Sequence, residues 1–294
     1  MVTKTPVRPR KEIQSQKSRQ RNIEILGILA FVVLMGVILP LLLSGFRLGL
    51  LGRFLSLAIV ALGIDLIWGF TGLLSLGHGI FFALGGYAFA MFLQLNSLGE
   101  GQIPEFFGLY GVAELPWFWQ PFSSLPFTLM AIFTIPAIVA GLLGYLVFRN
   151  RIRGVYFSIL TQAALVVFFN LFNGQQKWIN GTNGLKTDTS IFLGQEVGSD
   201  RMQMTFYLIT VVMLMLMYLL CRWLTSGRFG RLLVAIRDDE NRVRFSGYDP
   251  TGFKVLVFAV SGAIAGIAGA LYPVQSGIVS PQYMAIAFSI EMVI

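Results

Sequence analysis

Seven long apolar stretches, each about the length of a membrane-crossing helix, dominate this sequence. A helix needs about 20 consecutive apolar residues to cross the hydrocarbon core of a bilayer. The stretches lie near residues 25–44, 54–70, 76–95, 126–148, 154–173, 203–223 and 253–272, and an eighth begins near 287 and is cut short by the end of the sequence. We therefore predict an all-α integral membrane protein, a polytopic helical bundle of about eight transmembrane segments with the last one truncated.

The low content of charged residues supports a membrane protein. Only 12% of the 294 residues are charged, whereas a soluble domain has about 25%. So few charges cannot solvate the surface of a globule in water. The net charge of +8 raises nucleic acid as a partner, but the charges lie in blocks between the apolar stretches, where membrane topology explains them. We therefore expect no nucleic-acid partner.

The chain divides into a basic N-terminal tail and a membrane domain. Residues 1–23 are polar and basic, and residues 24–294 contain the apolar stretches. The first stretch is longer than a signal-peptide core of about 7–15 residues, and no cleavage site of small residues follows it. The sequence therefore favours an uncleaved first helix over a signal peptide.

Positive charge is distributed unevenly among the connections. Most of the 22 lysines and arginines lie in the N-terminal tail and in connections 149–153 and 222–254, whereas loop 96–125 has none. Connections rich in positive charge stay in the cytoplasm. We therefore predict a multi-pass protein of the cell inner membrane, with its N-terminus and loop 224–252 in the cytoplasm and with loops 96–125 and 174–202 outside.

One glycine-rich segment, GFTGLLSLGHGI at residues 69–80, interrupts the apolar pattern. Glycine at this density weakens a continuous helix. Non-helical backbone at membrane depth is tolerated only inside protein or beside a water-filled cavity. The segment therefore predicts a broken or re-entrant helix in the bundle interior that lines a solute path. A tight turn between two closely packed helices is the alternative.

Polar side chains at or near this segment are candidate solute-path groups, chosen from their positions: Ser75, His78, Thr161 and Gln162. His78 is the only histidine; it could gate the path by protonation, but a structural hydrogen bond across helices is the favoured interpretation. Asp65 and Glu291 lie within or next to predicted spans, so each is either a functional intramembrane carboxylate or a group near the headgroups.

Small residues recur every three or four positions in the apolar stretch at 253–272. They include Gly262, Gly266 and Gly269. Small residues at this spacing allow helix backbones to approach closely in lipid. We predict a helix-packing face.

The connection 224–252 contains a short amphipathic segment. Its apolar residues Leu232, Leu233, Ala235 and Ile236 form one stripe in a helix. Such a helix can dock into a groove of a soluble partner. A basic helix that rests on anionic lipid is the alternative, but the acidic cluster at 238–240 argues against lipid as the main target.

Sequence motifs of catalysis are absent. The chain has no G-x-x-x-x-G-K-[ST] phosphate-binding loop. With one histidine and one cysteine, we can nominate neither a metal site of the usual kind nor an acid–base pair. We therefore expect no enzyme activity, no cofactor and no metal in this chain.

Three segments carry a resemblance to a known family: LLSLGHG–FFALGGY at 73–87, GR…AIRDDE at 230–240 and AGIAGALY at 265–272. They resemble the branched-chain amino-acid (LivM-like) permease family of ABC importers. Other stretches resemble the urea-transporter branch of that family. Among these are DLIWG at 65–69 and GVYFSILTQA at 154–163.

The resemblance implies a permease subunit that translocates urea, or short amides, by alternating access. It implies a second permease subunit in a heterodimer, two cytoplasmic ATPases that use the ATP, and a periplasmic solute-binding protein. The implied ATPase-coupling residues are Arg231, Arg237, Asp238, Asp239, Glu240 and Gly247. The chain departs from the E-A-A-x-x-x-G pattern of many importers, because residues 241–243 are Asn, Arg and Val.

Three other functions stay open. The first is an ABC permease for branched-chain or other amino acids, which needs groups that bind a carboxylate and an ammonium. The second is a passive channel or secondary carrier, against which the partner-like loop 224–252 counts. The third is a membrane enzyme, for which no catalytic set can be nominated.

Overall fold

The computed structural model describes residues 10–99, 102–152 and 154–293, with side chains from residue 22 onward. Residues 1–9 of the predicted basic tail lie outside this part of the chain. Internal contacts divide the chain into two units, Met1–Ser44 and Gly45–Ile294, which are described separately below.

The first unit is a nearly continuous helix. It comprises α1 (Arg10–Val33), the π-helical turn η1 (Leu34–Ile38) and α2 (Leu39–Leu42). Pro40 has no N–H to bond the carbonyl one turn earlier, and π geometry is a common response to such a gap. Residues Asn22–Leu42 are long and apolar enough to cross a membrane, which confirms the first predicted span.

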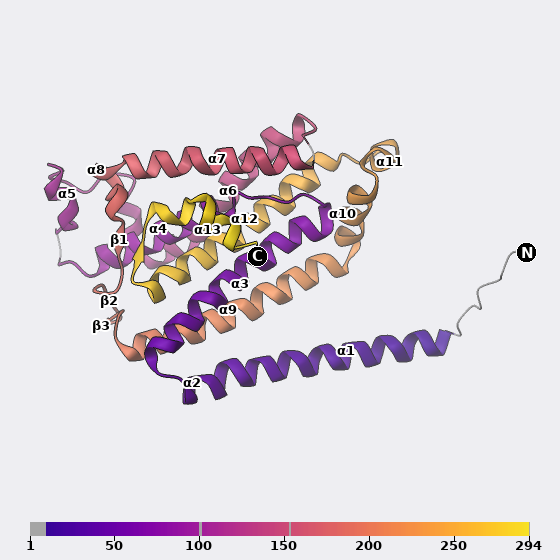
Figure 1. Cartoon of the computed structure of the whole chain (residues 1–294), viewed down its shortest axis with the longest axis horizontal. Coiled ribbons are helices and arrows are strands. Elements are labelled where there is room, and N and C mark those ends of the chain that lie inside the picture. Colours follow the sequence, from indigo (N-terminus) through magenta and orange to yellow (C-terminus); the bar gives the residue numbers. More distant parts are fainter. Residues whose placement is uncertain (1–9, 100–101, 153, 294) are drawn as a thin grey trace, which may run out of the picture. The chain divides into compact units, whose positions relative to one another are not determined.

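The second unit is a bundle of six long helices, shown with its connections in Figure 1. They are α3 (Gly45–Thr71), α4 (His78–Asn96), α6 (Leu125–Arg149), α7 (Val155–Gly174), α9 (Asp200–Ser226) and α12 (Pro250–Ser276). Together with the first unit, the described residues contain seven helices that can cross a membrane by length and composition. The predicted all-α polytopic fold is therefore confirmed. The start of the predicted eighth segment forms the short helix α13 (Ile286–Glu291).

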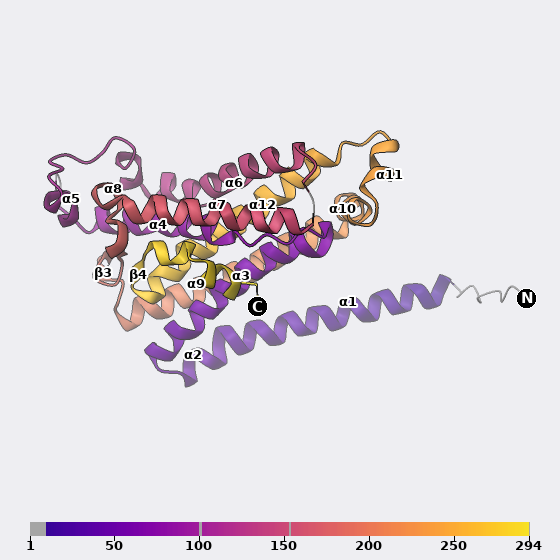
Figure 2. The same ribbon diagram turned by 45° about the horizontal axis from the view of Figure 1, so that its top comes forward.

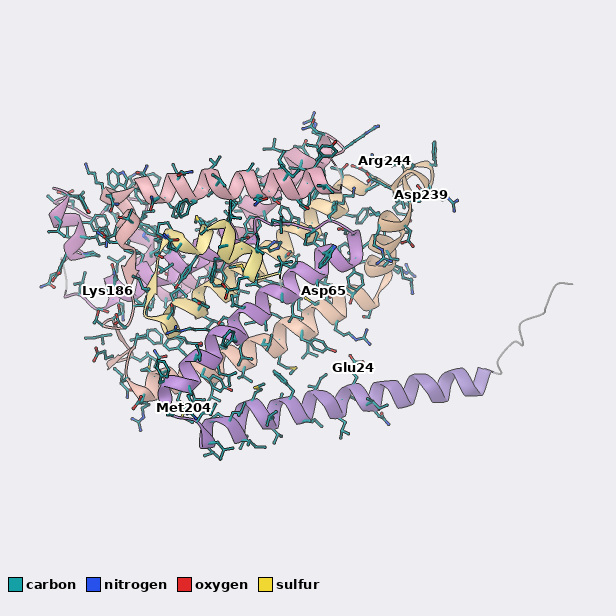
Figure 3. All side chains as sticks on the ribbon, viewed as in Figure 1. Glu24, Asp65, Lys186, Met204, Asp239 and Arg244 are labelled. Carbon is teal, nitrogen blue, oxygen red and sulfur yellow. The ribbon has the colours of Figure 1, made fainter. Side chains whose placement is uncertain are left out.

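The connections of the second unit separate to its two ends (Figures 1 and 2). One end carries α5 (Glu105–Leu109), η2 (Gln120–Ser123), α8 (Gln176–Ile179) and η3 (Gly181–Asn183). The opposite end carries α10 (Arg228–Asp238) and α11 (Glu240–Phe245). In Figure 3, Lys186 lies at the first end, and Asp239 and Arg244 lie at the second. Loops 96–125 and 174–202 thus share one end, as the topology prediction requires.

Two small antiparallel sheets, which the sequence did not predict, shape the first end. Strand β1 (Leu185–Lys186) pairs with β4 (Ile278–Val279), and β2 (Ile191–Phe192) pairs with β3 (Gln195–Glu196). Leu193 and Gly194 both have positive φ, which is the geometry of a two-residue hairpin turn. The β1–β4 pair ties loop 174–202 to the chain after α12.

Helix α12 lies at the centre of the second unit and packs against α3, α4 and α6. Gly262 and Gly266 face α6, and Gly269 faces α4. A Cβ on Gly262 would lie 2.6 Å from that of Ala140, and a Cβ on Gly269 would overlap the Phe82 carbonyl. The close approach of these backbones therefore depends on the missing side chains.

Helix α3 begins at Gly45 rather than near residue 54, where the sequence placed its start. Arg47 and Arg53 are therefore helical residues, whereas the sequence assigned both to a connection. Arg53 is half-buried within the bundle. The sequence analysis did not predict the burial of Arg53, because it assigned every arginine outside an apolar stretch to a connection between helices.

Candidate functional site

The chain between α3 and α4 leaves helical geometry at residues 72–77. Gly72 has a φ of 71°, a conformation that glycine adopts without strain. Ser75 and Gly77 are buried, and α4 starts at His78 inside the bundle. The segment leaves helical geometry inside the bundle, and we call residues 72–77 the helix break; its predicted role in lining a solute path stays a prediction.

Helix α7 bonds the backbone of the helix break. The Ser158 hydroxyl donates to the Leu74 carbonyl over 2.6 Å. The Leu76 N–H donates to Thr161 Oγ1 over 3.1 Å, and that hydroxyl donates to the Ser158 carbonyl. A Cβ on Gly77 would lie 2.7 Å from the Thr161 carbonyl oxygen. The backbone of the helix break is not helical, so its N–H and C=O groups need other hydrogen-bond partners at membrane depth. Helix α7 supplies such partners.

Two of the four predicted solute-path residues, Ser75 and Thr161, lie at this break. Ser75 is fully buried, and its Oγ accepts a long hydrogen bond of 3.4 Å from the Gly77 N–H. Thr161 is 3% exposed. Gln162 follows it on α7 and is half-buried. Ser75 belongs to the break and Thr161 borders it from α7, and both are neutral hydrogen-bond donors and acceptors.

The fourth predicted path residue, His78, lies in a packed junction of α3, α4 and α12. Its Nε2 is 2.7 Å from the Ser261 hydroxyl, and that hydroxyl donates to the Gly63 carbonyl. Because a hydroxyl has one hydrogen, His78 must donate from Nε2. The ring packs edge-on against Phe81 and Phe258, and the side chain is fully buried. This environment fits the structural interpretation better than a gate.

The α10–α11 loop is fixed by a buried ion-pair network. Glu240 is 7% exposed. One of its carboxylate oxygens lies 2.6 Å from Lys254 Nζ, and the other lies 3.0 Å from Arg244 Nη2. Lys254 belongs to α12, so the network joins the loop to the central helix. Glu240 therefore anchors the loop internally, and its predicted contact with an ATPase stays a prediction.

Two more acidic residues begin helices at this end. Asp239 accepts hydrogen bonds from the backbone N–H groups of Asn241 and Arg242 at the start of α11. Asp249 accepts from the Thr251 N–H over 3.0 Å at the start of α12. That backbone hydrogen bond, more than the nearby arginine charge, holds the pKa of Asp249 below its usual value. These carboxylates satisfy N–H groups that a helix start leaves free.

Three other predicted coupling residues are accessible at the loop surface. The side chains of Arg231 and Asp238 are exposed. Gly247 follows α11 with a φ of 86°, and its N–H bonds the Arg244 carbonyl. This is the left-handed ending that helices commonly take at glycine.

Arg237 connects the α10–α11 loop to the end of α3. Its Nη1 donates to the Gly69 carbonyl over 2.7 Å. A Cβ added to Gly72 would lie 3.1 Å from the Cγ of Arg237. A polar pocket of about 300 Å³ lies between loop and break; Gly72, Arg237 and Lys254 are among the residues that line it. Sequence analysis nominated Arg237, but the spacing gave no signal of its contact with the break.

The predicted apolar stripe of α10 is divided between two faces. Leu233 and Ile236 are buried, because α10 packs against α3 and α9. Leu232 and Ala235 instead line a groove between α10 and α11. The prediction of one docking stripe was therefore wrong, since half of it is already covered within this chain.

A family model described as "Branched-chain amino acid transport system / permease component" matches residues 46–294. The chain belongs to this family. The match includes the helix break, the α10–α11 loop and the central helix α12, so the features described above lie in the part shared with the family.

Curated relatives agree with the family assignment. The chain is 28% identical over 252 residues to the high-affinity branched-chain amino acid transport system permease protein LivM of Salmonella typhimurium, covering 79% of this chain and 53% of that protein. It is 22% identical over 238 residues to BraD of Pseudomonas aeruginosa, covering 76% of this chain and 68% of that protein. The chain thus spans about half the length of the LivM relatives it matches. No solved structure matches it.

Proposed function

We propose that this chain is the permease subunit of an ATP-driven importer, in which ATPase movement at the α10–α11 loop opens and closes a solute path beside the helix break. The observation that carries the proposal is the Arg237–Gly69 hydrogen bond of 2.7 Å. It joins the loop that can meet a soluble partner directly to the last turn of α3 before the break.

The groove between α10 and α11 supports the docking part of the proposal. Leu232, Ala235, Asp239 and Arg242 are among its lining residues. Apolar side chains flanked by charges of both signs suit a protein surface better than an anionic membrane. The Glu240–Lys254 ion pair holds the loop on α12, so force applied at the groove reaches the centre of the bundle.

The assembly follows from the same proposal. A second permease subunit forms a heterodimer with this chain, two cytoplasmic ATPases bind and hydrolyse ATP, and a periplasmic binding protein delivers solute. The chain lies in the inner membrane with the α10–α11 end and the N-terminus in the cytoplasm, as the distribution of positive charge supports. Residues 1–23 form the basic tail, and residues 24–294 form the membrane domain.

Branched-chain amino acids are the first candidate solutes. The named relatives are permeases of branched-chain amino acid transport systems, and the family description agrees. At 22–28% identity, however, substrate preference can change while the machine is kept.

Urea is the second candidate, favoured by two observations. Stretches at 65–69 and 154–163 resemble the urea branch of the family. The second of these supplies Ser158 and Thr161, which place neutral hydrogen-bonding groups at the helix break, and Gln162, the residue after Thr161. A small neutral amide needs donors and acceptors but no fixed counter-charge.

The test is solute uptake by cells in which this gene is deleted or restored. Radiolabelled leucine and radiolabelled urea are supplied separately at micromolar concentration, with and without an agent that depletes ATP. We expect one of the two solutes to enter in an ATP-dependent manner only when the gene is present. Gene-dependent uptake that is indifferent to ATP would establish a passive channel or secondary carrier instead. Identical uptake of both solutes in the two strains would overturn the proposal.

A further inference from the structure

A cavity of about 370 Å³ lies between α4, α6 and α7, at the end of the bundle that carries η2 and α8. Sites for small molecules usually have volumes of about 300–1,000 Å³ and mostly apolar walls. We call this cavity the aromatic pocket, because half of its described lining residues are aromatic: Tyr87, Phe118, Trp119, Phe122, Phe172 and Trp178.

Specific contacts hold the walls of the aromatic pocket in place. The Trp119 Nε1 donates to the Trp178 carbonyl over 2.9 Å, which joins the chain before η2 to α8. The rings of Tyr87 and Phe172 pack with centroids 5.2 Å apart and join α4 to α7. Helices α6 and α7 each pack against α4, but in the described chain they make at most slight contact with each other. Leu171 of α7 also lines the pocket and is 52% exposed, so the pocket adjoins the surface that α7 presents to lipid.

The Tyr87 hydroxyl is a buried polar group without a partner among the described residues. Tyr87 is 2% exposed, and its hydroxyl makes no hydrogen bond. A buried hydroxyl without a partner costs free energy. Water is a poor partner here, because a buried water needs two to four polar groups and the surface of this pocket is almost wholly apolar. The pocket therefore offers one hydroxyl in apolar surroundings.

The aromatic pocket suits neither candidate solute. No described lining residue carries a charge, so the ammonium and carboxylate of an amino acid would lose water without gaining ion partners. Urea has N–H groups on both nitrogens, and an apolar wall would leave most of them unbonded. The pocket therefore selects an uncharged and largely apolar ligand, different from both candidate solutes.

We propose that the aromatic pocket binds an uncharged molecule of the lipid phase that has a flat ring and a carbonyl or hydroxyl oxygen, the chemistry of a prenylated quinone or phenol. The ring packs against the aromatic walls, where ring pairs gain free energy beyond that of the buried area. The oxygen bonds the Tyr87 hydroxyl, and the apolar tail passes Leu171 into lipid. A phospholipid acyl chain could fill the same volume, but a methylene chain has neither a ring nor an oxygen.

The bound ring has a structural consequence for the helix break. It fills the space between α6 and α7 and so braces α7 against α4. Helix α7 carries Ser158 and Thr161, whose hydroxyls bond the backbone of the break. A ligand from the lipid phase thus stabilises the helix that holds the break.

The experiment titrates the purified complete importer in detergent with decyl-benzoquinone and records tryptophan fluorescence, which a quinone quenches on contact with an indole. Trp119 and Trp178 line the pocket and report its occupancy. The variants are Tyr87→Phe, which removes only the hydroxyl, and Ala88→Leu, which fills part of the pocket from a lining position. The matched control is Ala61→Leu, at an exposed alanine of α3. A second titration uses a phospholipid with brominated acyl chains as the quencher.

We expect the quinone to quench the parent protein in a saturable manner, in addition to a linear component from partition into detergent. Tyr87→Phe should weaken the apparent affinity about two- to tenfold, the loss of one hydrogen bond. Ala88→Leu should remove the saturable component, and Ala61→Leu should keep it. Without ligand, Tyr87→Phe should retain the thermal midpoint of the parent, because the hydroxyl that it loses is unpaired.

Two results would overturn the proposal: no saturable quenching of the parent protein by the quinone, or equal affinity in the parent and in Tyr87→Phe. Saturable quenching by the brominated phospholipid alone would also overturn it and would identify an acyl chain as the occupant. If the thermal midpoint shows that Ala88→Leu does not fold, Tyr87→Phe still decides.

Discussion

The helix break and the α10–α11 loop both interrupt the series of long helices, yet they satisfy their polar groups by opposite means. At the break, hydroxyls of Ser158 and Thr161 bond the exposed backbone. In the loop, Glu240 is held between Lys254 and Arg244 by ion pairs. Burial of a hydrogen-bonded hydroxyl costs little free energy, and the hydroxyl can exchange its partner. Burial of a charged group costs much more free energy unless the group stays paired with an opposite charge.

This difference suggests that the loop is rigid and that the helix break can rearrange. The ion pairs fix the loop to the start of α12, so the two should move together. The hydroxyl bonds leave the break able to rearrange at little cost, because each hydroxyl can rotate to another carbonyl. Arg237 connects the loop to the end of α3 just before the break, through the Gly69 carbonyl. The following predictions test each part of this comparison, beginning with the largest effect.

The Glu240→Gln substitution tests whether charge pairing fixes the loop. It leaves the buried Lys254 ammonium without its 2.6 Å counter-charge, and loss of one partner from a buried pair costs about 3–5 kcal/mol. We expect a clear drop in the thermal midpoint of the detergent-purified protein. The double variant Glu240→Gln/Lys254→Met should recover most of that loss, since it removes the buried ammonium together with its counter-charge. A single variant as stable as the parent would show that the network does not hold the loop.

The Gly77→Ala substitution tests whether the break depends on close approach to α7. The added Cβ would lie 2.7 Å from the Thr161 carbonyl oxygen, and overpacking of this kind costs about 1–3 kcal/mol. The measurement is again the thermal midpoint. Gly252→Ala is the control, because nothing lies within 4 Å of its added Cβ and alanine favours a helix. Equal midpoints for the two variants would mean that α7 does not hold the break closely.

The Arg237→Ala substitution tests the contact between the two regions. Loss of one charge-assisted hydrogen bond corresponds to roughly a tenfold change in an equilibrium, so uptake per ATP hydrolysed should fall by about that factor. ATP hydrolysis itself should continue. Arg149→Ala is the control, since Arg149 lies at the same end and bonds only Tyr145 among the described residues. A normal ratio of uptake to hydrolysis would remove Arg237 from the mechanism.

The Asp249→Ala substitution gives the smallest effect and sharpens the description of the loop. It removes the hydrogen bond to the Thr251 N–H at the start of α12, which is worth about 1 kcal/mol. Because folding lowers the pKa of Asp249, its contribution is present above the ordinary value of 3.8 and is lost as the pH falls below that value toward the lowered pKa. Stability curves of parent and variant should therefore converge in acid; a gap that persists there would contradict this assignment.

The sequence predicted the fold well because a chain that crosses lipid as helices needs apolar stretches of about 20 residues, which are easy to recognise. Seven apolar stretches became seven helices of spanning length among the described residues. The break was predictable as well, since glycines at 69, 72, 77 and 79 cannot favour a continuous helix. The ends of helices were less predictable: α3 extends back to Gly45. Within this extension Arg53 bonds the Gln275 carbonyl, a contact that no hydropathy pattern records.

The site was predictable in its residue types but not in its contacts. Glu240 and Arg237 stand three positions apart in one charged segment, yet the first is buried against Lys254 and the second reaches Gly69. Leu233 and Leu232 are neighbours, but only Leu233 is fully buried. These differences arise from the way α10 packs on α3 and α9, which is tertiary information. The contact of Arg53 with the Gln275 carbonyl was not predicted for the same reason, because it depends on how α3 packs against α12.

The most direct test of the central claim, that ATPase movement at the α10–α11 loop rearranges the helix break, uses a cysteine at the break. In a Cys221→Ser background, the Ser75→Cys variant of the complete importer is alkylated by a small maleimide in the presence and absence of ATP. Ser75 is fully buried in this structure. The account predicts that the alkylation rate changes several-fold with ATP and that adding Arg237→Ala abolishes the change. Equal rates with and without ATP, in an importer that hydrolyses ATP normally, would contradict it.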